Sequence, residues 1–293
     1  MRRLDVVLVL LLLVGIAFST IGDLRSPQPR RPPPQRPPAA ALPSEPPPTD
    51  RPGTLPPPSD RDVGFEIEST PKESDVSGTA FAIGAGVWMT AEHVTESCGS
   101  LFLEAGGRLM PVFDLVEHPS ADVAVFRTRR SGPHLPLSDR LDTGQTGFHH
   151  GFPSGAPGDV LSTLVGRARI RVSGATNRIE PAVAWAERRR FPPQLERLGG
   201  ISGGPALDLE GRVVGVTVGS SPRRGTVITA APVSLREVIR QAGVNLGPEE
   251  TGRRAAPSPS RLTAFGDDLR RDFSVAKVIC LLRPPSRRPL SRR

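Results

Sequence analysis

The sequence predicts an all-β fold for residues 63–246, an antiparallel sandwich or barrel. Two observations support this prediction: short apolar or alternating runs recur along the segment, and turns rich in glycine and proline separate them. The runs are Thr79–Ile83, Val87–Met89, Leu101–Leu103, Val123–Phe126, Leu161–Val165, Ala168–Val172, Ala182–Trp185, Val213–Val218 and Val227–Ala231.

Residues 1–25 have the pattern of an export signal. Arg2 and Arg3 precede an apolar run from Val6 to Phe18. The signal is cleaved or kept as an anchor over residues 4–21, a length slightly short of a comfortable membrane span; a buried cytosolic helix is the alternative to both. In both export cases the two arginines stay inside, so we expect a periplasmic or other extracytoplasmic body, with or without an inner-membrane tether.

Residues 26–62 form a proline-rich linker. Of the 34 prolines in the chain, 15 lie between positions 27 and 58, and such runs favour extended polyproline II. This segment cannot build a core, so we expect a disordered spacer, with docking to a proline-binding partner as the alternative.

The charge is concentrated at the ends of the chain. The net charge is +8, of which residues 1–62 carry +2 and residues 247–293 carry +6, while residues 63–246 hold 19 basic and 19 acidic residues. The central domain therefore has no basic excess, and with 4% aromatic residues we expect no specific nucleic-acid partner.

Two cysteines exclude a disulfide framework and a thiolate zinc cluster. The pair His149-His150 has no third ligand at metal spacing, so we predict no metal site, and we expect no cofactor.

One helix is expected in the central domain, over residues 234–241. Ser234 is the expected N-cap, Glu237 completes a capping box, and Gly243 ends the helix. The remaining 247–293 is expected to be a basic, mostly disordered tail, within which Asp272–Leu282 could form a weak amphipathic helix. The tail arginines are interpreted as solvated, with contact to anionic lipid or nucleic acid as the alternative.

The most distinctive local motif is Leu198–Pro205, in which Ser202 lies among glycines. Glycines allow the backbone to approach a bound carbonyl closely and to point successive N–H groups at one spot. Such a spot can hold an oxyanion beside the serine hydroxyl. By itself, the motif is equally consistent with an ordinary glycine-rich turn.

A serine nucleophile needs a base and an orienting acid. His93 follows the run Val87–Thr90, and Asp122 begins the apolar run ending at Phe126. Each residue alone has an ordinary structural interpretation, as a surface histidine or a strand cap. The order His, Asp, Ser on a β-rich domain is much harder to explain by chance.

These motifs together resemble those of trypsin-like (chymotrypsin-fold) serine proteases, nearest the bacterial HtrA/Deg-type branch. The resemblance rests on Ser77–Val94, Ala121–Val125, Gly200–Val216 and the turn Gly151–Pro153, and it covers residues 63–246. It implies two six-stranded antiparallel β-barrels with one short C-terminal helix.

The resemblance also implies roles for individual residues. Ser202 would be the nucleophile, His93 the general base and Asp122 the orienting acid. The N–H groups of Gly200 and Ser202 would form the oxyanion hole. A substrate strand would pair with Thr217, Val218 and Gly219, and Glu196 would lie near the base of the primary pocket, where a surface position is the alternative.

The sequence departs from the family pattern at several positions. Ile201 precedes the nucleophile where many relatives have Asp or Asn, so activation through an ion pair with a new N-terminus is not expected. Val94 replaces a disulfide cysteine of the animal enzymes. For Cys98 we expect a free buried thiol, with a bridge to Cys280 after export as the alternative. We expect no PDZ domain after Gly247.

The sequence thus predicts an exported serine endopeptidase acting on protein or peptide substrates. The alternative is a non-catalytic peptide- or protein-binding module on the same scaffold. A third interpretation makes the basic tail a tether to anionic surfaces.

Overall fold

The computed structural model describes residues 53–68, 76–173, 178–221, 224–246 and 255–282. The expected signal or anchor and most of the expected linker lie outside these ranges. In the described residues no helix is long and apolar enough to cross a membrane.

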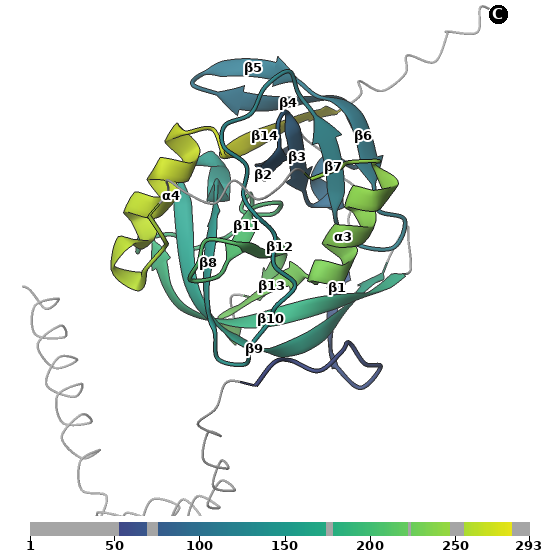
Figure 1. Ribbon diagram of the computed structural model, residues 1–293, viewed down its shortest axis with the longest axis vertical. Helices are drawn as coiled ribbons and strands as arrows, with labels where there is room; N and C mark the ends of the chain where they lie inside the picture. Colours follow the sequence, from purple (N-terminus) through teal and green to yellow (C-terminus); the bar gives the residue numbers. More distant parts are fainter. Residues whose placement is uncertain (1–52, 69–75, 174–177, 222–223, 247–254, 283–293) are drawn as a thin grey trace, which may run out of the picture. The chain divides into compact units, whose positions relative to one another are not determined.

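The described part of the chain is built on two seven-stranded sheets, and the predicted chymotrypsin-like fold class is confirmed (Figure 1). The first sheet has the order β5-β4-β14-β2-β3-β7-β6, and the second has the order β1-β9-β10-β13-β12-β11-β8. The strands of the first are β2 (Val76–Gly84), β3 (Val87–Thr90), β4 (Cys98–Ala105), β5 (Arg108–Pro111), β6 (Phe113–Glu117), β7 (Ala124–Arg127) and β14 (Val275–Leu282). Those of the second are β1 (Val63–Glu68), β8 (Thr146–Gly151), β9 (Gly158–Ser173), β10 (Arg178–Phe191), β11 (Pro205–Leu207), β12 (Val213–Ser221) and β13 (Thr226–Ala230).

The two sheets differ in closure. In the second sheet β8 pairs with both β11 and β9, which closes a six-stranded barrel, and β1 adds to β9 in parallel. In the first sheet no ladder joins β5 to β6 within the described residues, so it is a curled half-barrel instead of the closed barrel expected. We refer to these sheets below as the first and second barrels.

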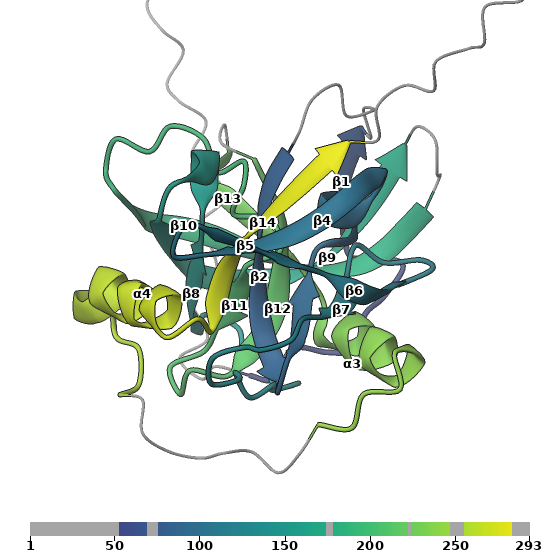
Figure 2. The ribbon, with the colours of Figure 1, turned by 90° about the horizontal axis from the view of Figure 1, so that it is seen from above.

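The strand β14 corrects the sequence prediction for the C-terminal region. It pairs with β2 on one side and β4 on the other, antiparallel to both (Figure 2). The expected mostly disordered tail is therefore wrong for residues 255–282, and so is the expected helix at 272–282. The apolar spacing fits a helix, but β-branched residues such as Val275 and Val278 also favour a strand, and burial between two neighbours decides the outcome.

Cys280 lies in β14 and forms a disulfide with Cys98 at the start of β4. The free thiol that we expected is thus wrong. The two cysteines are 182 residues apart in sequence. The antiparallel pairing of β14 with β4 brings them together.

Within the described ranges, three helices accompany the barrels: α2 (Glu92–Thr95), α3 (Pro232–Gln241) and α4 (Leu262–Arg271), with short 3-10 turns at Pro153–Gly155 and Pro259–Arg261. The helix α3 starts two residues earlier than predicted. Its N-cap is Ala231 and Pro232 occupies the first turn, so the predicted Ser234 cap and capping box are wrong. Proline fits the first turn because its missing N–H is not needed there.

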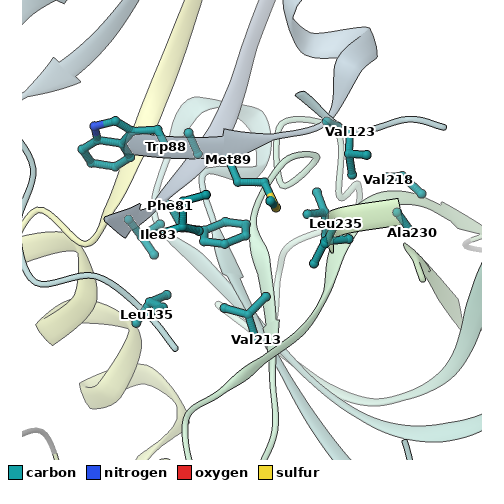
Figure 3. Close-up of a cluster of buried hydrophobic side chains, with 14 of the residues drawn as sticks. Phe81, Ile83, Trp88, Met89, Val123, Leu135, Val213, Val218, Ala230 and Leu235 are labelled. Atoms are coloured by element: carbon teal, nitrogen blue, oxygen red, sulfur yellow. The ribbon is translucent and has the colours of Figure 1, made fainter. Parts of the chain in front are cut away.

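The main hydrophobic core joins the two barrels. Figure 3 shows Phe81 and Met89 of β2 and β3 in one buried cluster with Val213 and Leu235, and the indole of Trp88 extends to the other side of β3. The second barrel also holds a separate cluster around Trp185. The structured region begins before the predicted boundary at 63, since Leu55 is buried in that cluster and its N–H donates to Leu141 O at 2.7 Å.

Candidate active site

His93 is carried by the short helix α2 directly after β3. The strand residues Val87–Thr90 are all buried, which fixes the start of the helix. Val94 packs beneath the helix against Gly78, where a Cβ would lie 2.5 Å from Val94 Cγ1. The His93 side chain is 40% exposed, so its imidazole is fixed at its base and open to a reactant.

Asp122 lies at the turn before β7 and holds His93 by two hydrogen bonds. His93 Nδ1 is 2.6 Å from Asp122 Oδ2, and the His93 backbone N–H donates to Oδ1 at 2.8 Å. The carboxylate is buried. Burial raises the pKa of Asp122, but the charge and hydrogen bonds of His93, followed by the charge of Arg178, outweigh it and lower the pKa.

The Ser202 loop is held against β2 by one threonine. Thr79 N–H donates to Ser202 O at 2.8 Å, and Thr79 Oγ1 donates to Gly200 O at 2.8 Å. Gly203 has φ +86°, and a Cβ there would overlap Thr79 O and Thr90 Oγ1. The absence of a side chain at Gly203 therefore lets the loop lie against the end of β3, two to three residues before His93.

The N–H groups expected to bind an oxyanion remain available. Gly200 has φ +97°, a value that few other residues adopt. Within the described residues, neither the Gly200 N–H nor the Ser202 N–H donates a hydrogen bond. Two unpaired N–H groups on one loop, beside a half-buried serine, are the arrangement that an oxyanion hole requires.

Ile201 is 2% exposed and belongs to the apolar cluster of the second barrel, with Leu198 and Trp185. Hydrophobic packing therefore holds the loop at the position where many trypsin relatives use an ion pair.

The strand expected to pair with a substrate has only part of its backbone hydrogen-bonding groups free. The Thr217 N–H and C=O are occupied by Gly204 and Gly203 at 2.8 and 2.7 Å. The register of β12 shifts at Val218, and residues 219–221 pair with β13 but, in the described residues, not with β11. A free edge thus begins near Gly219, beside the Ser202 loop.

Glu196 is exposed, and its backbone carbonyl accepts a hydrogen bond from Arg190 Nη1 at 3.1 Å. This placement corresponds to the surface alternative. The exposed side chain does not support the predicted carboxylate at the base of the primary pocket.

Sequence reasoning missed two residues of the site, Arg178 and Glu180. The Asp122 backbone N–H donates to Glu180 Oε2 at 2.5 Å, and Arg178 Nη2 donates to Glu92 Oε2 at 2.8 Å. No local pattern marks them, since both read as ordinary charged residues at the start of a strand.

Neither member of the pair His149-His150 joins this site. Both are fully buried: His149 contacts Thr217 and Ser162, and His150 Nδ1 lies 2.7 Å from Asp159 Oδ1. In the described residues, no group of three or more His, Cys, Asp or Glu side chains could hold a metal ion.

Residues 78–216 match the family model described as the trypsin-like peptidase domain. Two curated Mycobacterium tuberculosis proteins, serine protease Rv3671c of strain H37Rv and serine protease MT3772 of strain CDC 1551 / Oshkosh, are each 29% identical over 168 residues. The match covers 54% of this chain and 41% of each relative, so the chain spans less than half the length of these relatives.

The solved active form of the Rv3671c protease from M. tuberculosis has a similar fold. Its TM-score is 0.51 at 20% sequence identity, and the match covers 68% of this chain and 98% of that one. At this identity the likeness concerns the fold.

Proposed function

We propose that the chain is a serine endopeptidase that uses Ser202, His93 and Asp122, and the match of residues 78–216 to the trypsin-like peptidase domain supports this proposal. The observation that carries the proposal is the pair of hydrogen bonds between Asp122 and His93, at 2.6 Å to Nδ1 and 2.8 Å to the backbone N–H. A carboxylate so placed fixes the ring and keeps the proton on Nδ1, leaving Nε2 free to accept another.

Hydrolysis then proceeds in two halves. Ser202 Oγ forms a bond to the substrate carbonyl carbon while His93 Nε2 takes the hydroxyl proton. The C–N bond breaks, the same proton goes to the leaving amine, and an acyl-enzyme remains. Water, deprotonated by His93, releases the acid and restores Ser202. Asp122 stabilises the imidazolium formed in each half.

The backbone supplies the remaining functions. The N–H groups of Gly200 and Ser202 bind the developing oxyanion, and each such donor is worth about 3–4 kcal/mol of transition-state stabilisation. The free edge of β12 at residues 219–221 accepts an extended peptide as an added strand. Protein or peptide chains are therefore the substrate class that we propose.

We further propose that the domain acts outside the cytoplasm, with residues 1–25 as signal or anchor. The Cys98–Cys280 disulfide supports this location, because disulfides persist in oxidising compartments and are rare in the cytosol. Fusion of alkaline phosphatase after residue 62 would test it, because that enzyme is active only when exported. An inactive fusion, with an active one from a known signal as the control, would contradict this location.

The experiment that tests the activity is labelling of the full chain with a fluorophosphonate probe, together with digestion of an unfolded protein substrate. Ser202→Ala should abolish labelling and lower hydrolysis by about 10³–10⁶-fold without loss of fold, and His93→Ala should also abolish labelling. Ser59→Ala and His134→Ala are matched controls outside the site.

Wild-type protein that folds but neither labels nor cleaves would contradict the proposal. That outcome would favour the alternative, a peptide-binding module on the same scaffold, and binding of an extended peptide to the β12 edge would then be measured.

A further inference from the structure

Two side chains from the second barrel reach the His93–Asp122 pair of the first. Arg178 and Glu180 are two residues apart at the start of β10, so strand alternation puts both on the same face. The backbone of β10 pairs with β9 and β13. Their side chains are 15% and 0% exposed, so both are held between the barrels.

The contacts hold both members of the pair. Glu180 Oε2 accepts the Asp122 N–H at 2.5 Å and so fixes the backbone that carries the acid. Arg178 Nη2 donates to Glu92 Oε2 at 2.8 Å, on the residue next to His93. The same Nη2 lies 4.0 Å from Asp122 Oδ1, and Arg178 Nε lies 3.8 Å from Glu180 Oε1.

This arrangement is costly for stability. It gathers three buried or half-buried carboxylates, those of Glu92, Asp122 and Glu180, around one guanidinium. Arg178 Nε and Glu180 Oε1 are buried and make no hydrogen bond in the described residues. A well-packed apolar set of similar volume is often as stable as such an ionic cluster or more so. A contribution to folding stability therefore does not explain why Arg178 and Glu180 occupy these positions.

We propose that Arg178 and Glu180 are positioning residues that keep Asp122 aligned with His93 Nδ1 across the barrel interface. The inference rests on the hydrolysis proposed above. Glu180 fixes the Asp122 main chain, and Arg178 fixes the first turn of α2. Because both side chains come from β10, that strand sets the distance between these two contacts.

The same residues tune the charge that His93 senses. The ionisable groups around the pair are Glu92 of α2, Glu96 at the C-cap of α2, and Arg178 and Glu180 from β10. Burial, followed by the charge of Asp122, raises the pKa of Glu180 to about 7. Negative charge near an imidazolium stabilises it and positive charge destabilises it. Removal of Arg178 should thus raise the pH at which His93 loses its proton, whereas Glu180 is largely neutral below pH 7 and its removal should change that pH little.

The test uses Glu180→Leu, which removes the acceptor for the Asp122 N–H, and Arg178→Gln in the full chain, with Glu66→Leu and Arg171→Gln as exposed controls on neighbouring strands. The rate of fluorophosphonate labelling at Ser202 is measured across pH. Both variants should lower the maximal rate about tenfold or more, a loss typical of a misplaced catalytic group. The acid limb should move by about half a pH unit to higher pH for Arg178→Gln and stay close to that of wild type for Glu180→Leu. The controls should match wild type.

Three outcomes overturn the inference while leaving the hydrolase intact. They are wild-type rates in both variants, a lowered rate in Arg178→Gln with an unmoved acid limb, and an acid limb of Arg178→Gln that moves to lower pH. The second of these is the result that a merely structural role would give. If Arg178→Gln does not fold, Arg178→Lys keeps the charge without the planar fork. It should keep the wild-type acid limb and lower the rate, and a wild-type rate or a moved limb would also overturn the inference.

Failure of the proposed function gives a different result, namely folded wild-type protein that does not label at all. The positioning inference is then decided by an NMR titration of His93 in wild type and both variants. A midpoint that rises in Arg178→Gln and stays close to that of wild type in the Glu180 variant supports the inference, and equal midpoints in wild type and Arg178→Gln overturn it.

Discussion

His149 should make the free energy of unfolding fall in mild acid. Its ring is fully buried, with Nε2 2.8 Å from Ser162 Oγ and Nδ1 3.2 Å from Thr217 Oγ1. Trp185 packs edge-on at 5.5 Å. Burial, with a smaller contribution from the charge of His150, lowers the pKa of His149 from 6.5 to about 3. The folded protein therefore holds this histidine neutral.

The direction and size of this change in unfolding free energy follow from the difference in proton binding between the folded and unfolded states. Below pH 6.5 the unfolded chain binds a proton at His149 that the folded protein does not bind until about pH 3. The stability due to this residue is thus complete above pH 6.5 and is lost as the pH falls through that window. At about 1.36 kcal/mol per pH unit, a drop to pH 5 removes about 2 kcal/mol, an appreciable part of the 5–15 kcal/mol typical of a domain.

The perturbation is His149→Gln, which can still bond to both hydroxyls but does not titrate. Urea denaturation at about pH 7.5 and pH 5 gives the loss for each protein, and the wild type should lose about 2 kcal/mol more than the variant. Glu180, whose raised pKa has the opposite effect on stability, is present in both proteins and cancels in the comparison. Equal losses in the two proteins would refute the reasoning.

Three further predictions concern the same domain. Asp122→Asn should lower kcat by about 10⁴-fold with an unchanged circular dichroism spectrum, because the amide favours the wrong tautomer of His93; a loss below about tenfold would argue against the triad. Replacing Cys98 and Cys280 by Ser should lower the free energy of unfolding by about 2–5 kcal/mol, and reducing agent should then destabilise only the wild type. A chain of residues 53–282 should unfold cooperatively, whereas a chain of residues 53–246 should not. The shorter chain lacks five buried side chains, each worth about 1.5–3 kcal/mol when buried, and a cooperative transition in it would contradict this prediction. Those side chains are Leu262, Phe265, Leu269, Val275 and Val278.

The sequence was informative where chemistry demands particular residues. A nucleophile loop needs glycines at close approaches, and Gly203 has such an approach to Thr79 and Thr90. The contact between His93 and Asp122 was inferred from residue order and family motifs, and the structure forms it. The strands were predictable because alternation and turn residues act locally.

The sequence was uninformative where distant contacts decide. Residues 275–282 are short and fit both a helical and an extended pattern, and only the gap between β2 and β4 selects the strand. Arg178 and Glu180 acquire their place from the packing of one barrel on the other, which no local spacing encodes. Glu196 was assigned by loop register alone, and its side chain is exposed in the structure.

The place of β14 has a consequence for the timing of synthesis. A ribosome adds residues in order, and domains generally fold as units once their parts have emerged. The first barrel carries His93 and Asp122, yet the strand between β2 and β4 is made almost 200 residues after β2. Until residues 275–282 are available, β2 and β4 have open edges and the barrel is incomplete. A nascent chain should therefore be unable to cleave neighbouring proteins until residues 275–282 have been synthesised.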